Sequence, residues 1–171
     1  MKNKTIVGID PGQKGAIAVF SPDGTLDIWD MKPLIVATGS FKSLDANRLD
    51  ALIGSAIPDP ENALVFCEES LIVHGNGIKT ARPIFDARGV MRAVLALRGV
   101  KMEYVSPIAW KRYYGLTKAS KADSVEKAIE LLPKYADFFR KEYRKRIIDL
   151  DGRAEAALIG LYGKATKGGK D

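Results

Sequence analysis

The apolar run at residues 63–67, Ala-Leu-Val-Phe-Cys, constrains the fold of this 171-residue chain more than any other segment. A strand without a polar face is expected to lie in a sheet that is covered on both sides. The run ends abruptly in Glu68 and Glu69. Carboxylates at the end of a buried strand are unusual, because charged groups rarely leave water without a partner. The sequence therefore predicts an α/β protein with an acidic group at one end of a central strand.

The remaining segments extend this layout. Turn signals at residues 11–12 and 22–24 separate three short strands, which predicts an antiparallel meander over the first thirty residues. Helices are expected at 43–56, 80–98, 120–132, 135–147 and 152–161, a short helix after Ser106-Pro107, a fifth strand at 100–105 and a loop at 70–79. This order predicts a mixed five-stranded sheet, with three strands in the meander and two parallel strands, and helices on both faces.

Length and composition exclude several classes of protein. A chain of 171 residues with 46% hydrophobic residues is expected to form one domain over residues 1–171, with a frayed polar tail at 164–171. One cysteine excludes an internal disulfide, and one histidine argues against a His-rich zinc site. No apolar run approaches a membrane span of about 20 residues, and no signal peptide is expected. We therefore predict a cytoplasmic protein.

Positive charge is concentrated in the last part of the chain. Residues 1–105 carry 12 Lys/Arg and 12 Asp/Glu, whereas residues 106–171 carry 15 and 9, so the net charge of +6 lies in the second segment. One basic face is expected. Such a face is either a footprint for a phosphate backbone or a solvated surface, and charge alone does not separate the two.

Four carboxylates are expected to converge. Asp10 ends the first strand, Glu68 ends the fourth, and Asp151 and Glu155 lie four residues apart on one face of the last helix. If the first and fourth strands are neighbours, these groups repel one another unless cations bind between them. Oxygen ligands suit magnesium or manganese. A cluster of this kind beside a basic surface is what two-metal phosphodiester hydrolysis requires.

Each acid also has a plainer structural explanation. Asp10 precedes Pro-Gly and is a common turn residue, and Glu68 or Glu69 is then only a solvated strand end. Asp151 is equally suited to cap a helix, and Glu155 to interact with the helix dipole. Singly these acids are weak signals, but all four fall at the ends of predicted elements, which favours the metal site.

Four segments resemble, in order, the motifs of RuvC-like Holliday junction resolvases, especially the phage-type branch. They are residues 8–12 (GIDPG), 65–68 (VFCE), 105–111 (VSPIAWK) and 151–158 (DGRAEAAL). The first motif is also similar to the opening of sugar kinases and actin-like ATPases, whereas the third and fourth are more specific. The resemblance implies a ribonuclease H-like fold, a homodimer, and magnesium-dependent nicking of two strands at a four-way DNA junction. A phage origin would place the protein in the host cytoplasm.

The same resemblance implies metal-ligand roles. Asp10 matches the first-strand ligand that bridges two Mg²⁺ ions, for which Mn²⁺ is an expected substitute. Glu68 matches the ligand on the central strand, and Glu155 matches the last acid of the carboxy-terminal motif. These residues, with Asp151, are the expected catalytic groups.

Two of these positions keep rivals. Bacterial resolvases space their final two acids three residues apart, and Gly152 stands at that position here. Asp151, four residues before the last acid, still lies on the same helical face, and Asp149 is its less favoured substitute. Glu69 rivals Glu68, because adjacent side chains of a strand point to opposite faces.

Basic residues form the predicted DNA-binding set. Three lysines near the Trp110 motif are expected to hold phosphates at the cleaved bond or to stabilise its developing charge: Lys111, Lys118 and Lys121. A predicted basic helix offers five more cations for counterion release, and these are Arg140, Lys141, Arg144, Lys145 and Arg146. The alternative for both sets is a solvated surface. Trp110 itself is predicted to be a packing residue.

The predicted function is structure-selective cleavage of four-way DNA junctions. A nuclease of the same fold that processes RNA, like the pre-16S rRNA nuclease family, or that cuts other branched DNA, is the first alternative. A module that binds junctions without cutting them is the second. A kinase-like phosphotransferase is a third, but such enzymes need a second lobe, for which 171 residues leave no room.

Overall fold

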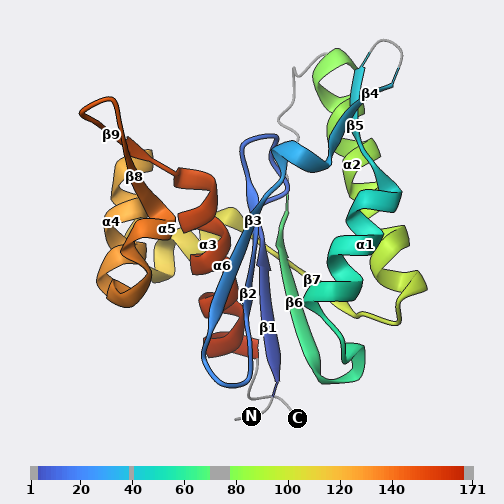
Figure 1. Ribbon diagram of the computed structural model, residues 1–171, viewed down its shortest axis with the longest axis horizontal. Coiled ribbons are helices and arrows are strands. Elements are labelled where there is room, and N and C mark those ends of the chain that lie inside the picture. Colours follow the sequence, from blue (N-terminus) through green and yellow to red (C-terminus); the bar gives the residue numbers. More distant parts are fainter. Residues whose placement is uncertain (1–3, 39–40, 70–77, 168–171) are drawn as a thin grey trace.

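A five-stranded mixed sheet lies at the centre of the computed structural model, which describes residues 4–38, 41–69 and 78–167 (Figure 1). The strand order is β3-β2-β1-β6-β7. Strands β1, β2 and β3 are antiparallel neighbours, whereas β6 runs parallel to β1 and to β7. The strands are β1 Thr5–Ile9, β2 Ala16–Phe20, β3 Leu26–Asp30, β6 Ala63–Glu68 and β7 Met102–Val105. The predicted meander with two added parallel strands is confirmed.

Helices cover both faces of this sheet, as predicted. Figure 1 shows α1 and α2 on one side, and α3 to α6 on the other. Their bounds are α1 Ala46–Ala56, α2 Ile78–Leu97, α3 Pro107–Tyr113, α4 Lys121–Leu131, α5 Ala136–Phe139 and α6 Asp151–Lys167. Short 3₁₀ turns occur at Lys32–Leu34, Pro60–Asn62 and Pro133–Tyr135. In the described part of the chain, no helix combines the length and the apolar character that a membrane span needs.

Residues of the central strands alternate between two apolar cores. Ile6 of β1 and Phe66 of β6 pack with α3 to α6, whereas Val7 and Val65 pack with α1 and α2. All five residues of β1 are buried. A strand with both faces in apolar cores must be apolar throughout, which explains the continuous runs in β1 and β6.

Small residues allow α6 to lie very close to β1. A Cβ atom on Gly8 of β1 would overlap the carbonyl oxygen of Ala156 and the amide nitrogen of Gly160. Because these are backbone atoms, they cannot rotate away. The alanine- and glycine-rich sequence of α6 therefore sets the short packing distance between this helix and β1.

One predicted helix is wrong. The structure has the short helix α5 and then a hairpin of β8 Arg140–Tyr143 and β9 Arg146–Asp149, where the sequence predicted a basic helix over 135–147. The run of Arg, Lys and Glu favours a helix locally, but tertiary contacts override such weak propensities. Arg140 is extended and donates hydrogen bonds to Asp149 across the hairpin, at 2.8 Å, and to Glu126 of α4, at 2.6 Å.

Three further boundaries differ from the prediction. A second hairpin, β4 Ile35–Thr38 with β5 Phe41–Leu44, precedes α1 and was not predicted. The helix itself begins only at Ala46, because Asp45 caps it and accepts hydrogen bonds from the amides of Asn47 and Arg48. Helix α6 continues to Lys167, so residues 164–167 of the expected frayed tail are helical. Residues 168–171, and 70–77 of the predicted loop, lie outside the described part of the chain.

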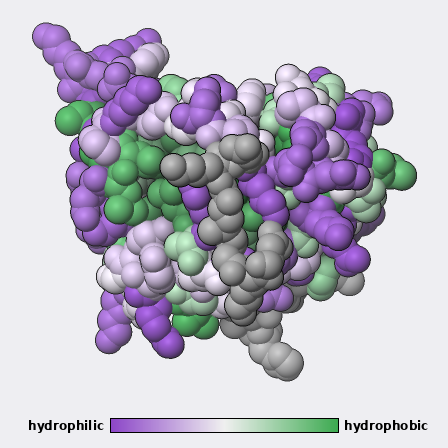
Figure 2. Space-filling view, turned by 90° about the horizontal axis from the view of Figure 1, so that it is seen from below, coloured by the Kyte–Doolittle hydropathy of each residue, from purple (hydrophilic) through white to green (hydrophobic). Residues whose placement is uncertain are grey.

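The end of the molecule where β1 begins is opposite to the end that carries the acids. Figure 2 shows this end, with apolar side chains gathered on the side where Figure 1 places α3 to α6. Hydrophilic side chains cover both flanks of the face.

Candidate active site

Asp10 directly follows β1 and is held by the turn to β2. Its backbone amide donates to the carbonyl of Ala16 at 3.0 Å, and its Oδ1 accepts a hydrogen bond from the amide of Gly12 at 3.0 Å. Burial raises the pKa of Asp10 to about 6. The hydrogen bond from Gly12 opposes this rise, whereas the negative charges of Glu155 and Asp151 add to it. A carboxylate so placed favours a bound proton or a cation.

Glu68 lies at the matching end of the neighbouring parallel strand. Ile9 of β1 pairs with Cys67 of β6, so the residues that follow them, Asp10 and Glu68, emerge side by side. Glu68 is partly buried and Glu69 is exposed, and Oε2 of Glu68 accepts a hydrogen bond from the indole Nε1 of Trp110 at 2.7 Å. Burial raises the pKa of Glu68 to about 7. The bond from Trp110 opposes the rise, and the charges of Asp10 and Glu155 add to it.

Helix α6 brings two more acids to this end of the sheet. Asp151 is its first residue and Glu155 stands one turn later, on the helix that packs against β1. Both act on the pKa of Asp10, and Glu155 also acts on that of Glu68. Asp149, the rival of Asp151, instead accepts a hydrogen bond from Arg140 in the hairpin. We refer to Asp10, Glu68, Asp151 and Glu155 as the acid cluster.

Two of the three predicted lysines pair with the acid cluster. Nζ of Lys121 lies 2.5 Å from Oδ2 of Asp151, and Nζ of Lys111 lies 3.4 Å from Oε1 of Glu155. Ser124 of α4 also donates to Oε1 of Glu155, at 3.3 Å. The lysines thus balance part of the negative charge. Lys118 is exposed and lines a different groove, together with Asp123, Glu126 and Glu130.

The five basic residues at 140–146 have different environments. Arg140 is engaged in the two ion pairs that anchor the hairpin. The other four, Lys141, Arg144, Lys145 and Arg146, are exposed. Figure 1 shows that the hairpin projects beyond α4 and α5, away from the sheet.

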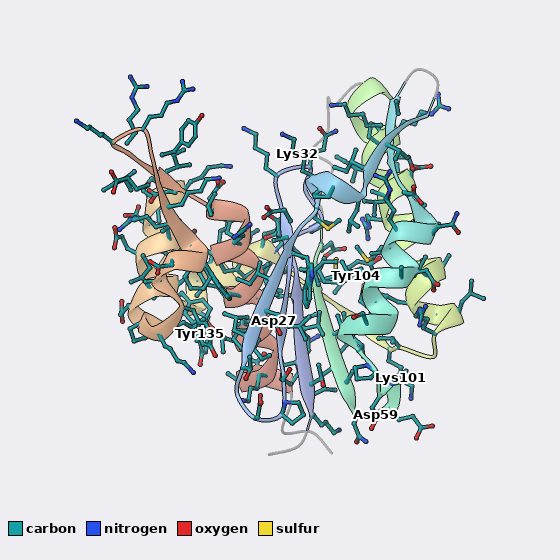
Figure 3. The ribbon with its side chains drawn as sticks, viewed as in Figure 1. Asp27, Lys32, Asp59, Lys101, Tyr104 and Tyr135 are labelled. Carbon is teal, nitrogen blue, oxygen red and sulfur yellow. The ribbon has the colours of Figure 1, made fainter. Side chains whose placement is uncertain are left out.

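A cleft of about 300 Å³ adjoins the α6 end of the acid cluster. It is lined by residues 13–15 of the first turn, by Asp30 and Lys32, and by residues 149–153. Figure 3 shows Lys32 at the upper end of the sheet. One wall of the cleft thus carries Lys14 and Lys32, and the other carries Arg153, which is paired with Asp30.

The chemistry of the acid cluster fits a divalent cation. Its four side chains offer only carboxylate oxygens, the ligands preferred by Mg²⁺ and Mn²⁺. Burial and mutual repulsion raise the pKa of Asp10 and of Glu68, so positive charge is favoured between them. Across the described residues, no group of three or more such ligands lies close enough together to hold one ion as the side chains stand. In this conformation, the ammonium groups of Lys111 and Lys121 supply part of the positive charge that balances the carboxylates.

Two structural contacts of the site were not predicted. Trp110 is fully buried, as expected, but its hydrogen bond to Glu68 was not foreseen. Arg153 forms a two-pronged pair with Asp30 of β3, with N–O distances of 2.7 and 2.8 Å. Both residues stand inside the recognised motifs, so their positions carried a signal, although their partners are 42 and 123 residues away.

Comparisons with known proteins give matches among solved structures. No protein-family profile matches the sequence, and no curated protein matches it. RuvC of Thermus thermophilus in complex with a Holliday junction substrate superposes with a TM-score of 0.60 at 15% identity, covering 96% of this chain and 97% of that one. A second structure of Thermus thermophilus RuvC gives a TM-score of 0.57 at 16% identity, with 94% and 95% covered. The chain therefore has the RuvC fold, the ribonuclease H-like α/β arrangement predicted from its motifs.

Proposed function

We propose that this chain is a divalent-metal-dependent endonuclease that cuts four-way DNA junctions by paired nicks. The observation that carries the proposal is the acid cluster, in which three distant segments meet at the ends of β1 and β6 beside α6. The RuvC of Thermus thermophilus with the same fold is in complex with a Holliday junction substrate. Fold alone does not define a function, so the weight rests on the site.

Each residue of the site has a proposed role. Asp10 and Glu68, with Asp151 and Glu155, would hold two Mg²⁺ ions. When bound, such ions lower the pKa of an attacking water and stabilise the leaving oxygen. Asp10 and Glu68 are partly buried, which limits the access of bulk water to these carboxylates, and Trp110 fixes the orientation of Glu68.

Lys111 and Lys121 have a second role in this proposal. Each now neutralises one α6 acid. A metal ion would take over that neutralisation and leave both ammonium groups to hold the phosphate next to the cleaved bond. Lys118, Lys141, Arg144, Lys145 and Arg146 would bind DNA phosphates beyond the cleaved bond.

The proposal includes the assembly and the setting of the protein. Residues 1–171 form one nuclease domain, and two identical copies supply one site for each of the two strands to be cut. The proposed setting is the reducing cytoplasm.

The test compares a labelled four-way junction with a linear duplex of matched sequence, each with Mg²⁺ and with EDTA. We expect paired nicks at the junction that require Mg²⁺. Asp10→Asn or Glu68→Gln should abolish cleavage and leave junction binding, measured in Ca²⁺, within a few fold. Asp27→Asn is the matched control, because Asp27 is exposed near the start of β3, at the end of the strand opposite to Asp30 (Figure 3).

The remaining outcomes are informative. Mg²⁺-dependent cutting of flaps or RNA in place of the junction would keep the site and change the substrate. Tight junction binding without cutting by the unmodified protein would favour the non-cleaving module. Loss of binding together with cleavage in Asp10→Asn would contradict the metal-ligand role.

A further inference from the structure

The β8–β9 hairpin carries more than positive charge. Tyr143 and Ile147 near its tip are 54% and 72% exposed, next to the exposed cations of the turn. Large apolar side chains on a projecting arm are not needed to bind phosphates. Cations alternating with an aromatic ring are the combination used to bind single-stranded nucleic acid, in which bases stack on the ring.

The register of the hairpin separates these side chains by face. Tyr143 pairs with Arg146, and Lys141 with Ile148, so both pairs point the same way. The opposite face carries Glu142 with Ile147 and Arg140 with Asp149. One face therefore combines two cations, an aromatic ring and an aliphatic side chain without any carboxylate. The other face holds both carboxylates of the hairpin and the pair that anchors it to α4.

The base of the hairpin reaches the cleft beside the acid cluster. Asp30 lines that cleft, and its pKa is lowered first by the hydrogen bond with Arg153 and also by the charge of Lys141. The charge of Lys141 thus acts on one wall of the cleft, and Asp149 of the opposite face lines the cleft itself. A single residue, Leu150, separates β9 from Asp151 at the start of α6. DNA bound on the hairpin would therefore lie next to the helix that carries Asp151 and Glu155.

The turn of the hairpin is unusual for its sequence. Arg144 and Lys145 form the two-residue connection with φ values of 49° and 61°. A turn with positive φ at both positions favours Asn and Gly, because a longer side chain is strained there. Two long cations at strained positions indicate a role for their charge at the tip, since such strain is characteristic of functional sites.

We propose that the cationic face of the hairpin binds unstacked bases at the branch point of DNA, with Tyr143 stacked on one base and Lys141 and Arg146 on the flanking phosphates. This rests on the proposed function, because it takes branched DNA as the substrate. It adds a source of selectivity, since a branch point offers unstacked bases that a continuous duplex does not. Backbone contacts alone hold both forms through their phosphates.

The test measures the binding of junction and duplex by fluorescence anisotropy in Ca²⁺. Loss of one stacked base in Tyr143→Ala should weaken junction binding by roughly tenfold, with duplex binding unchanged. Tyr143→Phe keeps the ring and should bind as the unmodified protein does. Ile147→Ala is the matched control, because it removes a more exposed side chain from the opposite face. Stacking on Tyr143 should quench the fluorescence of a 2-aminopurine placed at the branch point. Among the three variants, only Tyr143→Ala should lose this quenching.

Several results would overturn the proposal. Equal loss of junction and duplex binding in Tyr143→Ala would make the hairpin a general phosphate contact. Unchanged binding, or an equal effect of Ile147→Ala, would remove the role of the face. If the unmodified protein cuts junctions with Mg²⁺ while Tyr143→Ala binds junction and duplex as the unmodified protein does, only the hairpin proposal fails. If the unmodified protein does not cut the junction with Mg²⁺ and does not distinguish it from duplex in binding, both proposals fail.

Discussion

Replacing Trp110 by phenylalanine tests whether this residue positions a metal ligand. The indole ring is fully buried and its Nε1 donates to Oε2 of Glu68 at 2.7 Å. Phenylalanine retains most of the apolar ring but has no N–H. The change therefore removes the hydrogen bond that holds Glu68, while the apolar surroundings of the ring persist.

The size of the effect follows from this bond. A hydrogen bond to a charged group contributes about 1.5–3 kcal/mol. At about 1.4 kcal/mol per factor of ten, its loss corresponds to roughly a 10- to 100-fold weaker interaction with the metal. Replacing residues that orient metal ligands has effects of about the same size. We therefore expect the Mg²⁺ concentration for half-maximal cleavage to rise by about one to two orders of magnitude, and saturating Mg²⁺ to restore most of the rate.

The assay is junction cleavage over a range of Mg²⁺ concentrations, with thermal melting measured on the same samples. Phe139→Leu is the control, because Phe139 is a fully buried aromatic residue of the same core. It should lower the melting temperature and leave the Mg²⁺ dependence unchanged. The reasoning is refuted if Trp110→Phe shows an unchanged Mg²⁺ requirement, or if both variants raise it equally.

Two further predictions concern the placement of α6. Gly8→Ala should lower the free energy of unfolding by more than the roughly 1–3 kcal/mol typical of overpacking, because backbone atoms on α6 block the new methyl group. The control is Gly89→Ala, at an open position in α2. In the same urea titration it should raise the free energy of unfolding by about 0.5–1 kcal/mol. Arg153→Gln should cost about 1 kcal/mol near neutral pH, the upper end for an exposed pair with good geometry. Because the pKa of Asp30 is lowered from 3.8 on folding, this difference should shrink as the pH falls below 3.8, and a constant difference would show that the ion pair is not its source.

The sheet and the acid cluster were predictable because their signals are local. Continuous apolar runs identified β1 and β6, and a spacing of four residues placed Asp151 and Glu155 on one face of a helix. Parallel neighbours end at the same side of a sheet, so Asp10 and Glu68 had to meet once β1 and β6 were adjacent. Each step needed only the period of an element and one rule of topology.

The parts that were not predicted depend on distant partners. The segment at 140–149 became a hairpin because Arg140 pairs with Asp149 and with Glu126, and neither contact is visible in the local pattern. The phosphate contacts of Lys111 and Lys121 stay a prediction, whereas their pairing with the acids in this conformation was not predicted. A basic side chain near a motif has the same sequence signal in both cases, and only the convergence of α3, α4 and α6 separates them.

Helix α6 connects the proposed substrate contacts with the proposed chemistry. It begins one residue after the hairpin, and the amide of Leu150 between them donates to the carbonyl of Phe139 at 2.8 Å. Its contact with Gly8 leaves no room for the helix to approach β1 further. A DNA strand held by the hairpin is thus positioned relative to α6, the same helix that carries Asp151 and Glu155. Variants that loosen this helix should impair cleavage more than junction binding, because the carboxylates must match Asp10 and Glu68, whereas phosphate contacts tolerate small displacements.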